Sequence, residues 1–417
     1  MQKIERIRSV LNNIIEACVL IVLFSLPFSK SAAESCVVLS IAVFFAKKIF
    51  IDKNAVLAVD KKIIFCLALY LAFNALSLVN SQYVPLSLSA LFSKVLKWIL
   101  FFIAVADTIR TPQQARRIFL TLLFSAALIL ADAVYQQYIT GRDFLHYPNP
   151  YPVFKFQSRP DGGMCFPTAS FPYPNDFASW INVCLLTFVA MAVFNLKNSV
   201  IYRAAAVTLS AFLGFFLFLT TTSSALLGTA VSVAVMVLIN VKKLFFPIVA
   251  VLLVIILAVS FVPYLRSYLT TGTLSKALSI NDRMAMWSAG WRIFMQHPVL
   301  GNGLNTFFEH FKYFREDEDK YKHGSYAHNC YLQMAADSGI FGLMSFLCFS
   351  FITVFLSLRR MLKKPASLEG SLVIGLSLGV IAFLVHAAFD TNLYSLNLAA
   401  LFWLSMGVME GLSEGCG

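Results

Sequence analysis

Long apolar stretches separated by short polar ones make up the hydropathy pattern of this chain. A helix needs about 20 apolar residues to cross the hydrocarbon core of a bilayer, and stretches of that length recur along the sequence. The regular alternation that predicts membrane β-strands is not seen. The pattern therefore predicts an all-α integral membrane protein with about twelve transmembrane helices, near residues 10–28, 33–50, 63–80, 86–106, 117–139, 176–195, 200–219, 224–241, 245–262, 331–358, 371–389 and 393–411.

Composition and charge agree with a membrane protein. Of the 417 residues, 59% are hydrophobic and 13% are charged, which is more apolar surface than a water-soluble core can bury. The formal net charge of +12 comes from small basic groups between the apolar stretches, so it indicates membrane topology and not a nucleic-acid partner. No two of the eight cysteines form a CxxC motif, and most of them lie inside apolar stretches. We therefore expect them to be packing residues and to form neither a metal site nor a disulfide framework.

The distribution of lysine and arginine predicts the orientation, because short cytoplasmic loops carry the excess of these residues. With the N-terminus in the cytoplasm, the short external loops contain only Lys30, and an even number of helices returns the C-terminus to the cytoplasm. The cytoplasmic side then collects Lys3, Arg6, Arg8, Lys47, Lys48, Lys53, Lys61, Lys62, Arg110, Arg116, Arg117, Lys197, Arg203, Lys242, Lys243, Arg359, Arg360, Lys363 and Lys364.

Two external segments, 140–175 and 263–330, are too long to be simple connections. The second of them divides the chain into nine N-terminal helices (1–262), the long loop itself, and three C-terminal helices (331–417). We expect the functional residues to be concentrated in these two loops.

The first loop is rich in aromatic residues and proline, which would suit sugar rings or a belt at the level of the lipid headgroups. Arg159 adds positive charge, although surface solvation would explain it equally well. The loop ends in Asn175 and Asp176, either of which could cap the next helix and leave N–H groups free to bind phosphate.

The second loop contains a predicted helix that Asn281 or Asp282 would cap and that would run to about residue 296. Arg283 and Trp287 fall on one face of it, together with Gly290 or Trp291, and Phe294. The guanidinium could bind a diphosphate, or it could form a salt bridge or a contact with the membrane surface. His297 and Pro298 would end the helix, and 301–303 (Gly-Asn-Gly) would form a turn.

His328 lies where the second loop meets the tenth predicted span, with Tyr326 and Asn329 beside it. Histidine titrates near neutral pH, so His328 is a candidate general base. A histidine that only packs at the membrane interface or in the core is the alternative.

Ionisable residues within the apolar spans are the remaining candidates. Lys94 and Lys97 are costly in lipid unless they are paired, hydrated or near a helix end. Either could face a lipid phosphate, or could extend its ammonium to the membrane surface. His386 and Asp390 are four residues apart near the external end of the eleventh predicted helix, so they could share a face and either pair or help order a site.

Taken together, these residues resemble the O-antigen ligase and polymerase superfamily of membrane glycosyltransferases, whose members have twelve helices and a long periplasmic loop late in the chain. A weaker match is the segment 171–178 (Phe-Pro-Tyr-Pro-Asn-Asp-Phe-Ala). The stronger match has four ordered pieces, which are Arg283 with Trp287, the run 297–303 (His-Pro-Val-Leu-Gly-Asn-Gly), Ala327-His328-Asn329 with Tyr331-Leu332-Gln333, and the run 339–342 (Gly-Ile-Phe-Gly).

The resemblance implies an inverting glycosyltransferase of the bacterial inner membrane, without metal or cofactor, that moves a glycan from undecaprenyl diphosphate to an acceptor hydroxyl at the periplasmic face. By this resemblance His328 would orient or deprotonate the acceptor, and Arg283 would hold the donor diphosphate. Lipid A core is the expected acceptor, with a growing glycan or a protein hydroxyl as alternatives. A transporter of lipid-linked glycans, with the intramembrane lysines and His386/Asp390 as a relay, is the alternative from another class.

The chain departs from the family pattern at the junction of the seventh and eighth helices. The family typically has an arginine there, whereas this chain reads Thr-Thr-Thr-Ser-Ser-Ala-Leu at 220–226. Lys94, Lys97 or Arg159 would then supply the positive charge, or diphosphate binding would be weaker, or the activity would be altered. Substrate contacts are expected from Arg159, Lys94, Lys97, Asn175, Trp287, Asn329, Tyr326, His386 and Asp390.

Overall fold

A computed structural model describes residues 2–52, 57–147, 166–194, 200–239, 283–314 and 326–415, and in these ranges it contains helices and no β-strand. A helix coincides with each predicted span that lies in them, whereas the predicted span 245–262 lies outside the described residues. Nine of the described helical stretches are long and apolar enough to cross a membrane, and α9 is a shorter apolar helix. The chain is therefore a multi-pass, all-helical membrane protein.

The helices before the first long loop are α1 (Gln2–Ser25), α2 (Lys30–Phe50), α3 (Lys61–Leu76), η1 (Ser77–Asn80), α4 (Val84–Ala90), η2 (Leu91–Leu96), α5 (Lys97–Thr108), α6 (Pro112–Tyr135) and η3 (Gln136–Thr140). Among these, η2 and η3 are π-helical turns. Local signals explain several of the starts: Thr111 and Gln114 form a capping box at α6, with a proline in its first turn.

The helices after that loop are α7 (Pro174–Phe194), α8 (Val200–Leu219), α9 (Ser223–Ile239), a helix at 283–296, α12 (Phe307–Phe314), α13 (Cys330–Met361), α14 (Leu368–Ala387), η4 (Asn392–Tyr394) and α15 (Leu396–Gly415). One predicted cap was wrong. Because α7 already begins at Pro174, Asn175 and Asp176 lie in its first turn and do not precede it. The predicted cap at 281–282 lies outside the described residues.

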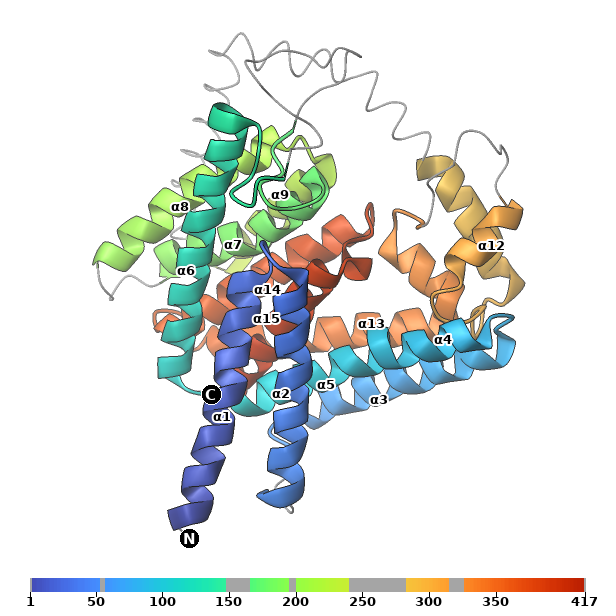
Figure 1. The fold of residues 1–417 in the computed structure, drawn as a ribbon, viewed down its shortest axis with the longest axis horizontal. Helices are drawn as coiled ribbons and strands as arrows, with labels where there is room; N and C mark the ends of the chain where they lie inside the picture. The colour runs from blue at the N-terminus through green and yellow to red at the C-terminus, as the bar shows by residue number, and fades with distance from the viewer. Residues whose placement is uncertain are drawn as a thin grey trace.

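Two sets of helices differ in direction. In Figure 1, α1, α2 and α6 run up the picture, whereas α3, α5 and α13 run across it toward α12. Between them α14 packs against α7, α9, α13 and α15. The approach of α14 to α7 requires a small residue, because a Cβ on Gly379 would lie 2.8 Å from the Cα of Val183.

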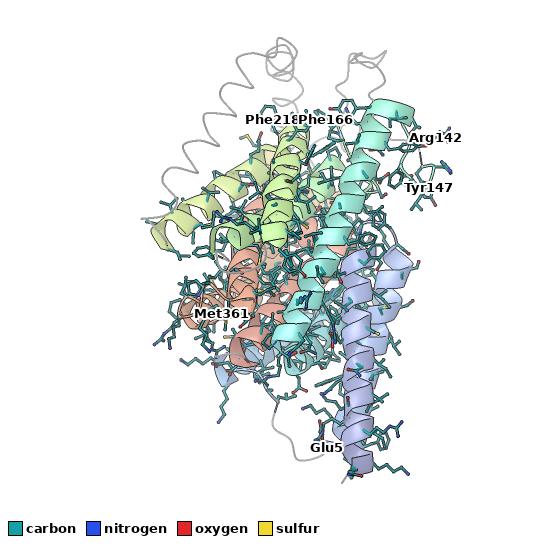
Figure 2. The ribbon with its side chains drawn as sticks, turned by 90° about the vertical axis from the view of Figure 1, so that its left-hand side faces the viewer. Glu5, Arg142, Tyr147, Phe166, Phe218 and Met361 are labelled. Carbon is teal, nitrogen blue, oxygen red and sulfur yellow. The ribbon has the colours of Figure 1, made fainter. Side chains whose placement is uncertain are left out.

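The first long loop and the N-terminal end of α1 lie at opposite ends of the molecule. Figure 2 shows Glu5 at one end, and Arg142 and Phe166 at the other. The first long loop therefore starts, after α6, at the end of the molecule away from the start of α1.

The turn after the helix at 283–296 is docked into a break in α13. The helix ends at residue 296, directly before His297 and Pro298, as predicted. At Gly339, φ is +70°, and a Cβ there would lie 2.1 Å from the carbonyl oxygen of Val299, so only glycine fits. The amides of Asn302 and Gly303 donate to the carbonyls of Ala336 and Asp337, each at 3.0 Å. The break therefore leaves carbonyls that the turn satisfies, and this fixes the second loop on the membrane helices.

The cysteines in the described part of the chain are free thiols, and most of them are buried. Their packing agrees with the expectation from the sequence, while Cys165 and Cys416 lie outside the described residues.

Candidate functional site

His328 lies at the start of α13, in a strained backbone position. Its φ is +47°, a left-handed conformation that is uncommon for residues other than glycine and that is found more often at functional sites. Asn329 follows it as the N-cap of α13, where its side-chain oxygen accepts the amides of Tyr331 and Leu332 at 3.0 Å each. The cap fixes the backbone beside a histidine whose side chain remains 38% exposed.

Asp390 joins His328 to two other elements. The Nδ1 atom of His328 lies 3.3 Å from Oδ1 of Asp390, and the side chain of Asp390 is only 9% exposed. The same oxygen accepts the amide of Thr391 at 2.8 Å, while Oδ2 accepts a hydrogen bond from the amide nitrogen of Asn175. This carboxylate thus links the start of α13, the start of α7 and the corner after α14.

His386 is the third partner of this carboxylate. Its Nε2 lies 3.6 Å from Oδ2 of Asp390, and its Nδ1 lies 2.8 Å from the hydroxyl of Ser179. The pairing of His386 with Asp390 agrees with the expectation, but α14 ends at Ala387, so Asp390 lies beyond the helix and not on its face. Burial would raise the pKa of Asp390, yet the two histidines hold that pKa well below its usual range.

The junction between α8 and α9 contributes a hydroxyl to this cluster. Thr222 donates from Oγ1 to Oδ1 of Asn175 at 3.1 Å, and Asn175 in turn donates to Asp390. The resemblance leads us to expect an arginine at this junction, whereas Thr222 provides a neutral hydrogen-bond donor there. Sequence reasoning missed Ser179 and Thr222; the signal that would have found Ser179 is its position one helical turn after Asn175 within an apolar span.

The helix at 283–296 lies against His328. The indole Nε1 of Trp287 donates to the carbonyl oxygen of His328 at 3.4 Å, and its ring packs 6.2 Å from that of Phe389. Arg283 is half-buried and precedes Trp287 by one turn, so both lie on the same helix face. Gly290 belongs to the buried face, against Leu332, whereas Trp291 is 56% exposed.

A groove of about 490 Å³ opens beside this helix. Its lining includes Trp287, Trp291 and Arg292 from the helix, and Asn329 and Leu332 from the start of α13. Two aromatic rings, one cation and the residue next to His328 thus border the same open space, which could accommodate a glycan or its phosphate group.

Three other predicted site residues lie elsewhere. Lys94 donates to Oδ1 of Asn305 at 2.6 Å, and Lys97 pairs with Glu34 at 2.7 Å. Both lysines line a separate cavity, and the ring of Tyr326 packs 5.9 Å from that of Tyr394, which lines the same cavity. Arg159 lies outside the described residues.

Comparison with known proteins gives one match to a family. A family model described as O-antigen ligase matches residues 206–347 of this chain. This match supports membership in the O-antigen ligase family. No match to a curated protein was found. The part matched to the O-antigen ligase family contains Thr222, Arg283 and His328 but ends before His386 and Asp390, so the last two enter the site through the geometry alone.

Proposed function

We propose that this protein is a glycosyltransferase that moves a glycan from undecaprenyl diphosphate to an acceptor hydroxyl at the periplasmic face of the bacterial inner membrane. Lipid A core is the proposed acceptor, and neither metal nor cofactor takes part. The observation that carries the proposal is the contact of a partly exposed histidine, His328, with a buried carboxylate, Asp390, beside the arginine-bearing helix at 283–296.

In the proposed reaction the acceptor oxygen attacks the anomeric carbon from the face opposite to the diphosphate. A C–O bond forms to the acceptor, the anomeric C–O bond breaks, and its electron pair goes to the leaving diphosphate. The acceptor proton goes to Nε2 of His328. Asp390 supports this role because a hydrogen bond from Nδ1–H leaves Nε2 as the basic nitrogen, and because a carboxylate stabilises the imidazolium that forms. Such proton transfer contributes roughly 100-fold or more to the rate.

The leaving diphosphate needs positive charge. Arg283 is the proposed residue, because its guanidinium can form two parallel hydrogen bonds to phosphate oxygens and lies on the helix face that contacts His328. One such contact with growing negative charge is worth about 3 to 4 kcal/mol in the transition state. Arg292, which lines the adjoining groove, is a second cation within reach of a bound diphosphate there.

The test is transfer in proteoliposomes that contain the full-length protein, purified undecaprenyl-diphosphate glycan and purified acceptor, with no ion gradient. His328→Ala and Arg283→Ala should each abolish transfer while the protein still inserts normally. Matched controls are His297→Ala, an exposed histidine of the same loop, and Arg142→Ala, whose guanidinium binds the carbonyl of His146 within its own loop. Near-normal transfer by His328→Ala or Arg283→Ala would refute the role of that residue.

Further outcomes separate the competing functions. Movement of the donor across the bilayer only under a gradient, without transfer, would indicate the transporter. On a lipopolysaccharide gel of a deletion strain, loss of all long-chain glycan supports lipid A core as the acceptor, whereas core with a single repeat indicates a polymerase.

A further inference from the structure

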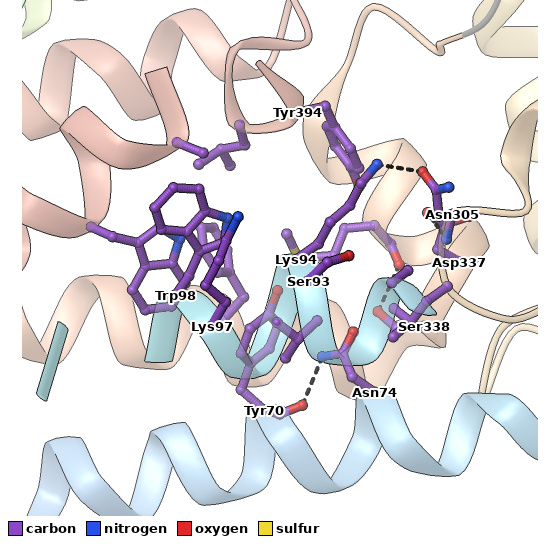
Figure 3. Close-up of a pocket in the computed structure, with 18 of the residues that line it drawn as sticks. Tyr70, Asn74, Ser93, Lys94, Lys97, Trp98, Asn305, Asp337, Ser338 and Tyr394 are labelled. Atoms are coloured by element: carbon purple, nitrogen blue, oxygen red, sulfur yellow. Dashed lines mark hydrogen bonds between the residues drawn. The ribbon is translucent and has the colours of Figure 1, made fainter. Parts of the chain in front are cut away.

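A second cavity, of about 280 Å³, is lined in part by residues 393–395 of the corner that carries Asp390. Figure 3 shows it bordered by α3, the π-helical turn η2, α13 and the turn that contains Asn305. Its apolar walls are aromatic, formed by Tyr70, Trp98, Tyr394 and Trp403. Asp390 and Tyr394 belong to the same short corner between α14 and α15, so the cavity and the cluster around His328 share this corner.

The polar lining of this cavity contains a buried carboxylate that is only half satisfied. Asp337 is 3% exposed, and its Oδ2 accepts the amide of Asn305 at 3.1 Å. Its Oδ1 is buried and has no hydrogen-bond partner among the residues that the structure describes. A buried polar atom without a partner is costly, so a hydrogen bond from a ligand would stabilise this oxygen.

Lys94 provides the complementary donor. Its ammonium binds Oδ1 of Asn305 with one N–H, at 2.6 Å, which leaves two N–H groups. Lys94 and Ser93 are exposed and line the cavity, so they mark its mouth. Both lie in η2, and π-helical turns inside α-helices are frequent at functional sites.

Lys94 and Asp337 provide a hydrogen-bond donor and an acceptor in the lining of the same cavity. A neutral hydroxyl can donate to Oδ1 of Asp337 and accept from Lys94, and aromatic walls suit the faces of a sugar ring. The volume corresponds to about nine waters at roughly 30 Å³ each, which is the scale of one ring and not of an oligosaccharide.

We propose that this cavity binds one uncharged sugar ring of the glycan substrate through Asp337 and Lys94. The inference rests on the proposed function, since it takes the ring from the donor or the acceptor glycan. Along α13 the distance from Cys330 to Asp337 is about 10 Å at 1.5 Å per residue, so a bound ring lies close to the proposed transfer centre.

The binding test uses the full-length protein in a detergent without a sugar headgroup, with D-glucose and N-acetyl-D-glucosamine as probes in saturation-transfer NMR. The wild type binds at least one of them. Lys94→Met weakens binding about tenfold, because a hydrogen bond to a charged group is lost. Ser93→Trp, at the exposed mouth, blocks binding without altering the core. Lys312→Met is the matched control, since Lys312 pairs with Glu309 away from the cavity, and it leaves binding unchanged.

Absence of binding by the wild type, or binding that neither Lys94→Met nor Ser93→Trp alters, overturns the proposal. Inorganic diphosphate that binds in place of the sugars and is lost in Lys94→Met also overturns it, because the cavity is then an anion site. His328→Ala should keep sugar binding while it loses transfer. A wild type that binds the sugars but transfers no glycan would count against the proposed function alone. In the transfer assay, a raised KM of Lys94→Met for acceptor assigns the ring to the acceptor, and a raised KM for donor assigns it to the donor.

Discussion

At one end of the helix bundle, Arg360 near the end of α13 binds the carboxylates of Asp60, Glu410 and Glu414 at 2.7 to 3.0 Å. At the other end of α13, His328 shares Asp390 with two neighbours and remains partly exposed. The first cluster joins the ends of helices that are distant in sequence, and each of its carboxylates has a cationic partner. The second cluster leaves the histidine side chain 38% exposed.

The comparison indicates different roles for similar chemistry. A closed ionic network stabilises a fold because every buried charge is compensated, whereas incompletely used polar groups remain available to a substrate. The end of the bundle that carries Arg360, here called the closed end, also contains Lys47 and Lys48, which both bind Asp107. These lysines and Arg360 lie in the last turns of α2 and α13, which the sequence predicts to be on the cytoplasmic side.

The largest effect is expected at the end of α13 that carries His328. Asp390→Asn should lower kcat at least about 100-fold, because an amide no longer fixes the tautomer of His328 or stabilises an imidazolium. Asp143→Asn is a matched control, since Asp143 is also buried and accepts the amide of Tyr147 within its own loop. Transfer by this variant should stay within about twofold of wild type. Comparable transfer by wild type and Asp390→Asn would remove Asp390 from the mechanism.

For Asp390→Asn we also predict how the change in Tm depends on pH. Because the pKa of Asp390 is held well below its usual range, its charge stabilises the folded protein at pH values above about 3.9, and this contribution is lost as the pH falls through the lower folded-state pKa. The difference in Tm between wild type and Asp390→Asn should therefore be constant near neutral pH and shrink below about pH 4. A difference that shrinks already between pH 7 and 5 would contradict this assignment.

Substitution of Arg360, at the other end of α13, should change the stability of the protein and leave kcat unchanged. Arg360→Ala leaves Glu410, which is fully buried, without its cation, and breaking a buried pair in this way costs about 3 kcal/mol. Thermal unfolding in detergent should show a lower Tm, while the folded fraction keeps a normal kcat. Arg359→Ala, on the adjacent residue, controls for loss of charge alone. A kcat that falls with Arg360→Ala at unchanged Tm would reverse the distinction between the two ends.

The sequence predicted where the helices lie better than it predicted which side chains contact each other at the two ends of α13. Apolar periodicity located the helices, and His297 with Pro298 marked the end of the helix at 283–296, because these are local signals. The contact between His328 and Asp390 joins residues 62 positions apart, and no local pattern tells which face of one helix meets another. For the same reason Asn175 was expected to cap α7, whereas its side chain binds Asp390 and Thr222.

Lys94 and Asp337 illustrate a second reason why the site was only partly predictable. Lys94 was a candidate for a lipid phosphate because a lysine in an apolar span needs a partner. Its partner, Asn305, is held by a turn that depends on the break in α13 at Gly339, and the sequence shows a glycine there but not the +70° angle it adopts. The need for a partner was therefore visible in the sequence, and the identity of the partner was not.

The smallest expected effect compares two hydrogen bonds of the same chemical type, each from a threonine hydroxyl to an asparagine side-chain oxygen. Thr222 donates to Asn175 at 3.1 Å, and Thr229 donates to Asn182 at 2.7 Å, so both pairs connect α7 with α9 or its start. Each valine variant loses one hydrogen bond, worth about 1 kcal/mol. Thr222→Val should lower kcat about fivefold, because Asn175 then orients Asp390 less well, whereas Thr229→Val should lower Tm slightly and leave kcat unchanged. Thr222→Ser should restore wild-type kcat. If both valine variants change kcat equally, the hydroxyl at the α8–α9 junction only holds the helices together and does not act through Asp390.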